Sequence, residues 1–441
     1  MTNKRTARAA PVPQSRLSRL VRLGLAAGEM AVGGAIEGLR RIGDDKAATT
    51  SVFLTAANAR RLAQRLAHLR GAAMKLGQLL SLEPGGSVPA EFSEALAILR
   101  ASATPMPTSQ LRRVLGREWG KGWESRFAAF DYQPVAAASI GQVHRANTRE
   151  GRDLALKIQY PGIARSIDSD VDHVASLVRL ARFLPGGFNL AGIVAEAKRQ
   201  LHQEADYLAE ARFLARYAKL VADEPDIAVP RVHADFTTRR ILAMDFVEGE
   251  PLAALAEGDV TQRQRNAVGE LLERLMLREL FEFRVMQSDP NFANYLWDRK
   301  SRRVVLLDFG STLEFPHALV EKYRNICRAI LKRDRTGIAK HAAAIGYLAP
   351  GDSDAMSEAV VDVIQLVCEP LVHRGPYDFA GSDLPSRARA MGFDLIFRKG
   401  LLRPPPPETT FLHRKLAGGF FLCAHIGARV DLNRLITSFV K

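Results

Sequence analysis

The sequence predicts an α+β fold of two lobes, a small lobe rich in β-strands followed by a mostly helical one, with a helical extension before them. Two observations predict this. Between Phe130 and Phe246, the segments 130–159 and 231–246 contain short runs of apolar residues that alternate with polar ones and are separated by turn residues such as Gly151, which is typical of strands. Before and after this stretch, apolar residues recur at every third or fourth position, which is typical of helices.

The chain has 441 residues, enough for one large two-lobed domain with an extension. Its apolar content of 47% is ordinary for a globular protein, so a sizeable core can be buried. We expect four regions: a basic, partly disordered or amphipathic segment at 1–50, a helical extension at 51–128, the β-rich lobe with a helical insertion at 129–249, and the helical lobe at 250–441.

The charge balance is basic, with a formal net charge of +14 and no acidic residue before Glu29. Such a balance suits nucleic acid, an anionic membrane or phosphorylated ligands, and a merely solvated basic surface is the plain alternative. No zinc pattern or RNA-binding signature accompanies the charge, so we expect no nucleic-acid partner. Leu17, Leu20, Val21 and Leu25 lie at helical spacing among arginines. This segment could lie on a membrane or pack on the domain.

The three cysteines, Cys327, Cys368 and Cys423, are scattered and form no metal-binding or disulfide pattern, which indicates a reducing compartment. No apolar run reaches the roughly 20 residues that a membrane helix needs. We therefore expect a cytoplasmic protein, attached peripherally to the inner or cytoplasmic membrane. The Arg-rich start is also compatible with a mitochondrial transit peptide if the source is eukaryotic.

The most informative stretch runs from Met286 to Gly310 and contains D-P-N-F-A-N followed, after two short predicted strands, by D-F-G. The strands at 295–297 and 304–307 should form a hairpin. A loop with D-x-x-x-x-N, a hairpin and D-F-G is the phosphoryl-transfer layout of protein kinases. In that layout Asp289 faces the nucleophile, while Asn294 and Asp308 hold Mg²⁺ through oxygen ligands.

The upstream elements that this layout requires are present in order. L-A-L-K, ending at Lys157, resembles the kinase strand whose lysine contacts the α and β phosphates. Before it, a loop of small residues could approach phosphates through backbone N–H groups. It consists of Ala136, Ala137, Ala138, Ser139, Ile140 and Gly141. The alanines make it stiffer than a glycine loop.

The glutamate partner of Lys157 is expected on a helix over 193–219, whose apolar residues suit burial and whose acids are Glu204, Asp206 and Glu210. A further strand is predicted at 231–235. The hinge to the helical lobe is expected at 247–250, where Glu248 would meet the nucleotide. Lys75, Gly77 and Gln78 form K-x-G-Q in the extension. A plain surface lysine is the alternative for Lys75. We reject 116–121 as a phosphate loop because its spacing is one residue short.

Six ordered motifs together resemble the AarF/UbiB family of atypical kinase-like proteins, in its alanine-rich-loop branch. They are K-L-G-Q at 75–78, A-A-A-S-I-G-Q-V-H at 136–144, L-K-I-Q-Y-P-G at 156–162, E-A-D-Y-L-A-E-A at 204–211, M-Q-S-D-P-N-F-A-N at 286–294 and L-D-F-G at 307–310. The resemblance covers roughly residues 60–430 and implies a bilobal protein-kinase-like fold.

The resemblance also implies roles for particular residues. In the family, Lys75 and Gln78 lie on an extension that folds over the active site near Glu204 and Asp206. Lys157 pairs with Glu210, and Asp289 occupies the catalytic-acid position. Asn294 and Asp308 bind the metal. The cofactors implied are ATP and Mg²⁺.

The function implied is that of an ATP-dependent atypical kinase or ATPase supporting ubiquinone (coenzyme Q) biosynthesis at a membrane surface. Two alternatives stay open at this point: a nucleotide-gated lipid-binding or scaffold pseudokinase, and a small-molecule phosphotransferase. The expected ligands are ATP and ADP. Quinone-precursor lipids, an anionic membrane and other quinone-biosynthesis proteins are the candidate partners. Because no A-P-E motif follows D-F-G, we expect no phosphorylation of generic protein substrates.

Overall fold

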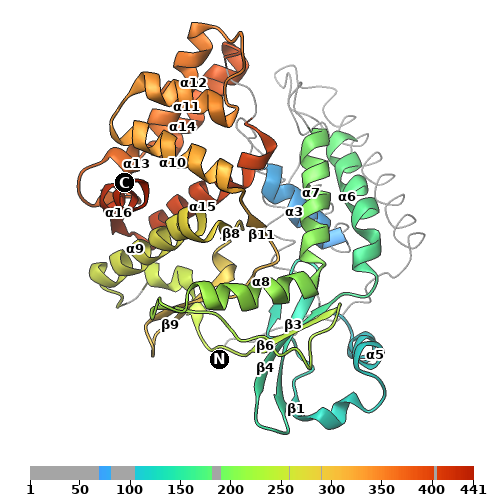
Figure 1. Ribbon diagram of the computed structural model, residues 1–441. Coiled ribbons are helices and arrows are strands. Elements are labelled where there is room, and N and C mark those ends of the chain that lie inside the picture. The colour runs from blue at the N-terminus through green and yellow to red at the C-terminus, as the bar shows by residue number, and fades with distance from the viewer. Residues whose placement is uncertain (1–68, 81–104, 181–189, 258, 290, 402–404) are drawn as a thin grey trace, which may run out of the picture. The chain divides into compact units, whose positions relative to one another are not determined.

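The computed structural model describes residues 69–80, 105–180, 190–257, 259–289, 291–401 and 405–441, which form two compact units (Figure 1). The first unit contains the described residues up to Arg212 and the segment Arg231–Phe246. The second contains Phe213–Pro230 and Val247–Lys441. The basic segment expected at 1–50 lies outside the described residues. The four predicted region boundaries stay predictions.

An antiparallel sheet of five strands forms the centre of the first unit, in the order β1–β3–β4–β6, with β2 paired to β3 as well. The strands are β1 (Phe127–Phe130), β2 (Ala136–Ala137), β3 (Gly141–Thr148), β4 (Asp153–Gln159) and β6 (Ile241–Asp245). β4 is the central strand, and its Leu154, Leu156 and Ile158 are fully buried. Its pairing places Lys157 opposite Val143 on β3 and Leu242 on β6.

Helices complete the first unit. They are α3 (Arg70–Leu80), α5 (Thr108–Trp119), the 3₁₀ turn η2 (Trp123–Arg126), α6 (Ile163–Leu180), α7 (Leu190–Glu204) and the beginning of α8 (Tyr207–Leu220). Figure 1 shows α6 and α7 side by side, and α3 packs against both. α3 buries Ala72, Ala73 and Leu76, whose helical spacing places them on one face.

The single helix predicted over 193–219 is wrong, because the structure divides this stretch into α7 and α8. The break falls at Ala205 and Asp206, where the Asp206 carboxylate accepts the N–H of Ala209 at 2.9 Å. An aspartate in that position caps the first turn of a new helix. Apolar spacing continues through the break, which is why the sequence pattern does not reveal it.

The second unit combines three small sheets with helices. Its strands are β5 (Ile227–Ala228), β7 (Glu250–Pro251), β8 (Val285–Gln287), β9 (Tyr295–Asp298), β10 (Arg303–Leu306), β11 (Thr312–Glu314), β12 (Tyr377–Asp378) and β13 (Arg429–Val430). They pair as β5–β10–β9–β7, β8–β11 and β12–β13. The β9–β10 hairpin confirms the predicted hairpin, with Tyr295 opposite Leu306.

The helices of the second unit begin with η3 (Leu252–Ala256), directly after Pro251. The others are α9 (Gln262–Arg278), η4 (Glu279–Phe283), η5 (Phe292–Asn294), α10 (His317–Leu331), α11 (Arg335–Ile345), α12 (Asp354–Val367), α13 (Glu369–Val372), α14 (Leu384–Phe393), η6 (Asp394–Arg398), η7 (Pro407–Thr409), α15 (Thr410–Ile426) and α16 (Leu432–Val440). α15 packs against α9. α9 starts with a capping box between Thr261 and Gln264.

The strand predicted at 231–235 is wrong. The structure has a single bridge between Val232 and Met244 there. The chain then turns at His233, whose carbonyl oxygen accepts the N–H groups of Phe236 and Thr237. The two-residue strands β12 and β13 were not expected in a stretch predicted as helical, because two residues show no period. The predicted fold class, a β-rich lobe and a helical lobe, is confirmed.

Among the described residues, no helix is both long and apolar enough to cross a membrane.

Candidate active site

Lys157 and Glu210 form a buried ion pair in the first unit. Lys157 Nζ lies 2.7 and 3.0 Å from the two carboxylate oxygens of Glu210, and the residues are 8% and 1% exposed. The lysine extends from the central strand β4 and the glutamate from the first turn of α8. Sequence reasoning expected this pair, and the structure brings the two side chains together.

The loop of small residues forms the turn between β2 and β3. Ala136 and Ala137 are exposed and pair with β3, and the N–H of Ala138 donates to the carbonyl of Gly141 at 2.9 Å. A Cβ on Gly141 would lie 2.4 Å from the carbonyl oxygen of Ile158, so only glycine fits there. Ile140 is buried. The turn therefore has a defined shape, and the stiffness expected from its alanines stays a prediction.

Glu204, at the end of α7, connects this turn to α3. Its Oε1 accepts a hydrogen bond from Lys75 Nζ at 2.6 Å, and its Oε2 accepts one from Ser139 Oγ at 2.5 Å. Lys75 is 2% exposed, so the plain alternative of a surface lysine is wrong. A Cβ on Gly71 of α3 would lie 2.8 Å from the Ser139 carbonyl oxygen. The helix that carries K-x-G-Q thus contacts the backbone of the small-residue turn.

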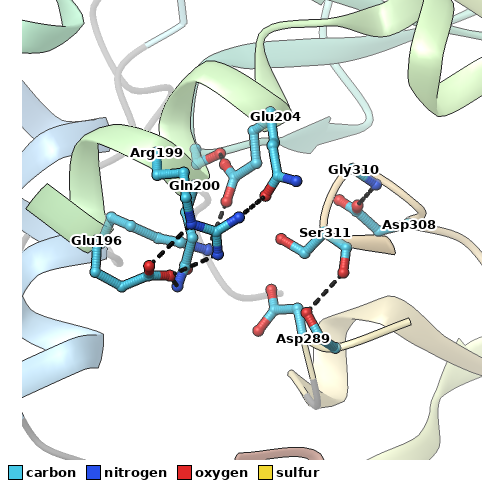
Figure 2. Close-up of polar contacts among 12 residues, drawn as sticks. Glu196, Arg199, Gln200, Glu204, Asp289, Asp308, Gly310 and Ser311 are labelled. Carbon is cyan, nitrogen blue, oxygen red and sulfur yellow. Dashed lines mark hydrogen bonds and ion pairs between the residues drawn. The ribbon is translucent and has the colours of Figure 1, made fainter. Parts of the chain in front are cut away.

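Polar side chains in the last turns of α7, before Glu204, bond to one another. Figure 2 shows Arg199 and Gln200 directed at the Glu196 carboxylate. Arg199 donates to both oxygens of Glu196, at 3.0 and 2.9 Å. Gln200 is buried. These contacts restrict the last turns of α7 and so the position of Glu204.

The other residues predicted in the extension and hinge have different surroundings. Gly77 is buried in α3, and Gln78 lies in the same helix with its side chain outside the described residues. Asp206 is exposed and caps α8. Glu248 lies in the loop before β7, where its side chain is 70% exposed and 3.8 Å from Lys300 Nζ. The structure therefore gives Asp206 a capping contact that the sequence pattern did not suggest.

In the second unit, the loop after β8 carries Asp289 and Asn294. Asn294 is buried, and its Nδ2 donates to the Asp289 carbonyl oxygen at 3.1 Å. Gln287 Nε2 donates to the same carbonyl at 2.7 Å. Asp289 is half-buried. Two side-chain amides therefore hold the backbone of Asp289, and Asn294 Nδ2 also lies 3.5 Å from the Asp289 carboxylate oxygen Oδ2.

The D-F-G segment follows β10, and its conformation is held by the main chain. Figure 2 shows the Asp308 carboxylate turned back onto the N–H of Gly310, at 2.9 Å. The carbonyl of Ser311 accepts both the N–H and the Oγ of Ser288, at 3.0 and 2.7 Å. Phe309 is fully buried, 4.7 Å from the ring of Tyr217 on α8. The contact between Ser288 and Ser311 joins the Asp289 loop to the D-F-G segment.

The donor atoms of Asn294 and Asp308 fit a hard cation. Because Asn294 Nδ2 is directed at the Asp289 carbonyl, its Oδ1 is the amide atom that a cation would meet, and Mg²⁺ prefers such oxygen ligands. Within the described part of the chain, no three His, Cys, Asp or Glu side chains group as a metal cluster. A cation here would therefore take the remainder of its ligands from phosphates and water.

Sequence reasoning missed two buried basic residues, Arg414 and Lys415, which contact the Asp289 loop from α15. Adjacent cations inside the apolar stretch from Thr410 to Ile426 were a signal that could have found them. Charged side chains are seldom buried unless they are paired.

Comparison with known proteins settles the family. The model of the ABC1 atypical kinase-like domain matches residues 98–342, a range that contains Lys157, Glu210 and the Asp289–Asp308 segment. This chain belongs to the ABC1 family of atypical kinase-like proteins. The predicted relationship to the AarF/UbiB proteins, and with it the atypical kinase-like function class, is confirmed.

Curated relatives of this ABC1 protein are similar over almost all of its length. It is 37% identical to the mitochondrial atypical kinase COQ8 of Saccharomyces cerevisiae, over 98% of this chain and 86% of that one. It is 38% identical to the mitochondrial atypical kinase COQ8B of Rattus norvegicus, over 95% of this chain and 79% of that one. Both relatives are named as mitochondrial.

A solved structure is also similar. The complex of Rv3197 with erythromycin from Mycobacterium tuberculosis aligns with a TM-score of 0.61 and 26% sequence identity. The alignment covers 87% of this chain and 96% of that chain. The fold of the ABC1 chain is therefore shared by a solved protein over most of both molecules.

Proposed function

We propose that this ABC1 protein binds Mg-ATP and hydrolyses it in support of ubiquinone biosynthesis at a membrane surface. The observation that carries the proposal is the buried pair of Lys157 and Glu210, held at 2.7 Å on β4 and α8. A strand lysine oriented by a helix glutamate is the group that contacts nucleotide phosphates in kinase-like proteins. The family membership supports the same assignment.

Each unit supplies part of the chemistry in this proposal. In the first unit, Lys157 contacts phosphate, and Glu210 keeps its ammonium group oriented. In the second unit, Asn294 and Asp308 hold the cation, and Asp289 orients the attacking hydroxyl or water. The bound Mg²⁺ would supply positive charge that offsets the charge of the phosphates.

Hydrolysis is favoured over transfer to proteins by the position of α3 in the first unit. Lys75 and Gly71 bring this helix onto the turn at Ser139, and the chain lacks the A-P-E motif of protein kinases. A small phenolic acceptor related to quinone precursors is the alternative to water. The names of the COQ8 relatives support a place in ubiquinone biosynthesis.

The test is an assay of ATP hydrolysis and phosphotransfer by the purified full chain. It is run with neutral or anionic vesicles, with and without phenolic quinone-precursor analogues. We expect Mg²⁺-dependent hydrolysis that anionic vesicles increase, and no transfer to generic protein substrates. Absence of nucleotide binding to a folded chain would contradict the proposal. Phosphorylation of a phenolic analogue would instead identify a small-molecule phosphotransferase.

Membrane docking is tested separately, by co-sedimentation of the full chain with the same vesicles at low and high salt. Each basic residue near an anionic surface contributes about 1 kcal/mol, so the acid-free start of the chain should bind anionic vesicles and release them in high salt. Equal binding to neutral vesicles would argue against a role for this charge.

A further inference from the structure

The unexplained feature of the second unit is a pair of adjacent basic residues inside α15. Arg414 and Lys415 are 8% and 5% exposed, although the helix around them is largely apolar. Burying a charge is unfavourable unless hydrogen bonds and an opposite charge compensate the lost hydration. Apolar residues could fill the same space, and a buried ion pair is often no more stabilising than such a replacement. Stability alone therefore gives little reason for two cations here.

Arg414 holds the backbone immediately before Asp289. Its Nε and Nη2 both donate to the carbonyl oxygen of Ser288, at 3.0 and 2.8 Å. The N–H and Oγ of Ser288 are in turn bonded to the Ser311 carbonyl beside the D-F-G segment. Both polar groups of the Ser288 main chain are thus held, one by α15 and the other by the D-F-G side. The position of the next residue, Asp289, depends on both contacts.

Lys415 contacts Gln287, the residue before Ser288. Its Nζ lies 3.1 Å from a Glu279 carboxylate oxygen, and it donates to Gln287 Oε1 at 3.4 Å and to the Tyr295 hydroxyl at 3.3 Å. Burial alone would lower the pKa of Lys415, but the charges and hydrogen bonds of Glu279 and Tyr295 together raise it above its ordinary value. The lysine therefore carries its charge inside the unit.

Glu279 completes the contact with the loop. One of its carboxylate oxygens accepts the N–H of Gln287 at 3.2 Å and the hydroxyl of Tyr217. The side chain of Gln287 donates to the Asp289 carbonyl, to which Asn294 is also bonded. A chain of buried hydrogen bonds thus runs from Lys415 through Gln287 to the backbone between the two proposed site residues.

We propose that Arg414 and Lys415 are positioning residues, which set the backbone of the Asp289 loop and through it the orientation of Asp289 and Asn294. This rests on the proposed function, because it assigns a catalytic task to the loop. Neither residue contacts the reacting groups in this account. A shift of about 1 Å in a catalytic group can cost about 100-fold in rate, so loosening the loop should affect turnover more than folding.

The decisive variant is Arg414→Lys. It keeps the positive charge but loses the pair of guanidinium nitrogens that donate to the Ser288 carbonyl oxygen. Its matched control is Arg328→Lys. Arg328 lies in the same unit and likewise uses Nε and Nη2 on main-chain carbonyls, those of Val440 and Lys441, at 2.6 and 2.9 Å. For Arg414→Lys we expect kcat to fall about 10- to 100-fold, with KM for ATP at saturating Mg²⁺ and the melting temperature close to those of the wild type. The control should keep its kcat.

A second readout does not require turnover. The Mg²⁺ concentration needed for half-maximal binding of a non-hydrolysable ATP analogue should rise in Arg414→Lys, since Asn294 is displaced, and stay unchanged in Arg328→Lys. If both variants match the wild type in kcat and in this Mg²⁺ dependence, or if both fall equally, the positioning role is overturned. If Arg414→Lys does not fold, the double variant Glu279→Gln/Lys415→Met decides. This double variant removes both charges of the buried pair. If it folds and keeps the wild-type kcat, the proposal is overturned. The proposal is also overturned if neither Arg414→Lys nor the double variant folds.

The experiment separates this inference from the proposed function. A wild-type chain that binds Mg²⁺ and the analogue but does not hydrolyse ATP contradicts the hydrolysis, and the Mg²⁺ dependence then decides the positioning role. A folded wild-type chain that binds no nucleotide contradicts both.

Discussion

The two units hold their functional groups by different means. In the first unit, charged side chains hold one another: Lys157 pairs with Glu210, and Lys75 pairs with Glu204. In the second, the side chains predicted to hold the metal bond chiefly to the main chain. Asp308 accepts the N–H of Gly310, and Asn294 donates to the Asp289 carbonyl. Substitutions in the first unit should therefore disturb folding and function together, whereas those in the second should remove function from a folded chain.

The largest effect is expected for Lys157→Met. It leaves the buried Glu210 carboxylate without its lysine, and breaking a buried pair costs about 3 to 5 kcal/mol. Chemical denaturation should show this loss of unfolding free energy. The double variant Lys157→Met/Glu210→Gln should recover most of the stability and none of the nucleotide binding. A single variant as stable as the wild type would mean that the pair does not contribute to folding in the first unit.

The second prediction concerns Asp308→Asn in the other unit. Losing a carboxylate that stabilises charge in the reaction should lower ATP turnover by about 10²- to 10³-fold. The amide can still accept the N–H of Gly310, so the free energy of unfolding should change by less than about 0.5 kcal/mol. Paired measurements of hydrolysis and thermal unfolding check this. A variant that is both inactive and strongly destabilised would remove the contrast between the units.

A smaller effect is expected from Glu273, a fully buried acid on α9. Burial raises the pKa of Glu273 to about 7, although the hydrogen bond from Cys423 lowers this pKa. The folded chain therefore holds a proton that the unfolded chain has released, and wild-type stability should fall as pH rises from about 4.5 to 7. Glu273→Gln should remove this loss and be more stable at pH 8 by up to about 3 kcal/mol.

The control for this pH dependence is Glu270→Gln, on the same helix but paired with Arg434 at the surface. It should leave the pH dependence of unfolding unchanged. If Glu273→Gln and the wild type respond identically to pH, the carboxyl is not titrating in this range.

The smallest effect is expected for Asp206→Ala, which removes the cap of α8. Loss of an aspartate cap costs about 1 kcal/mol, measurable as a small fall in melting temperature, while Asp206→Asn should be neutral because asparagine caps equally well. A loss of nucleotide affinity in both variants would instead favour a role for Asp206 beside the extension that folds over the active site, as the family resemblance implied.

The elements that bear the functional residues were predictable where a local pattern determines them. The strand of Lys157 and the hairpin of Tyr295 and Leu306 follow from short apolar runs between turn residues. The break between α7 and α8 was not predictable, because a capping bond at Asp206 begins a new helix while the apolar spacing continues through the break. The spacing of apolar residues reveals the period of a helix or strand, but it does not reveal a single hydrogen bond.

The long-range contacts could not be predicted from the sequence, for a different reason. Ser139 and Glu204 lie 65 positions apart, and Arg414 and Ser288 lie 126 apart. No spacing rule links such positions. The family resemblance implied that Lys75 lies near Glu204 but named no contact for Ser139 or Arg414. Buried cations in an apolar helix remain the local sign that such a contact exists.

The central claim is that Lys157 contacts the phosphates and that Asn294 and Asp308 hold the metal. Calorimetric titration of ATP, with and without Mg²⁺, tests it most directly on the wild type, Asp308→Asn and the folded double variant Lys157→Met/Glu210→Gln. We predict that the double variant binds poorly in both conditions, and that Asp308→Asn binds metal-free ATP normally but loses the increase in affinity that Mg²⁺ produces. Wild-type affinity for Mg-ATP in both variants would contradict the account.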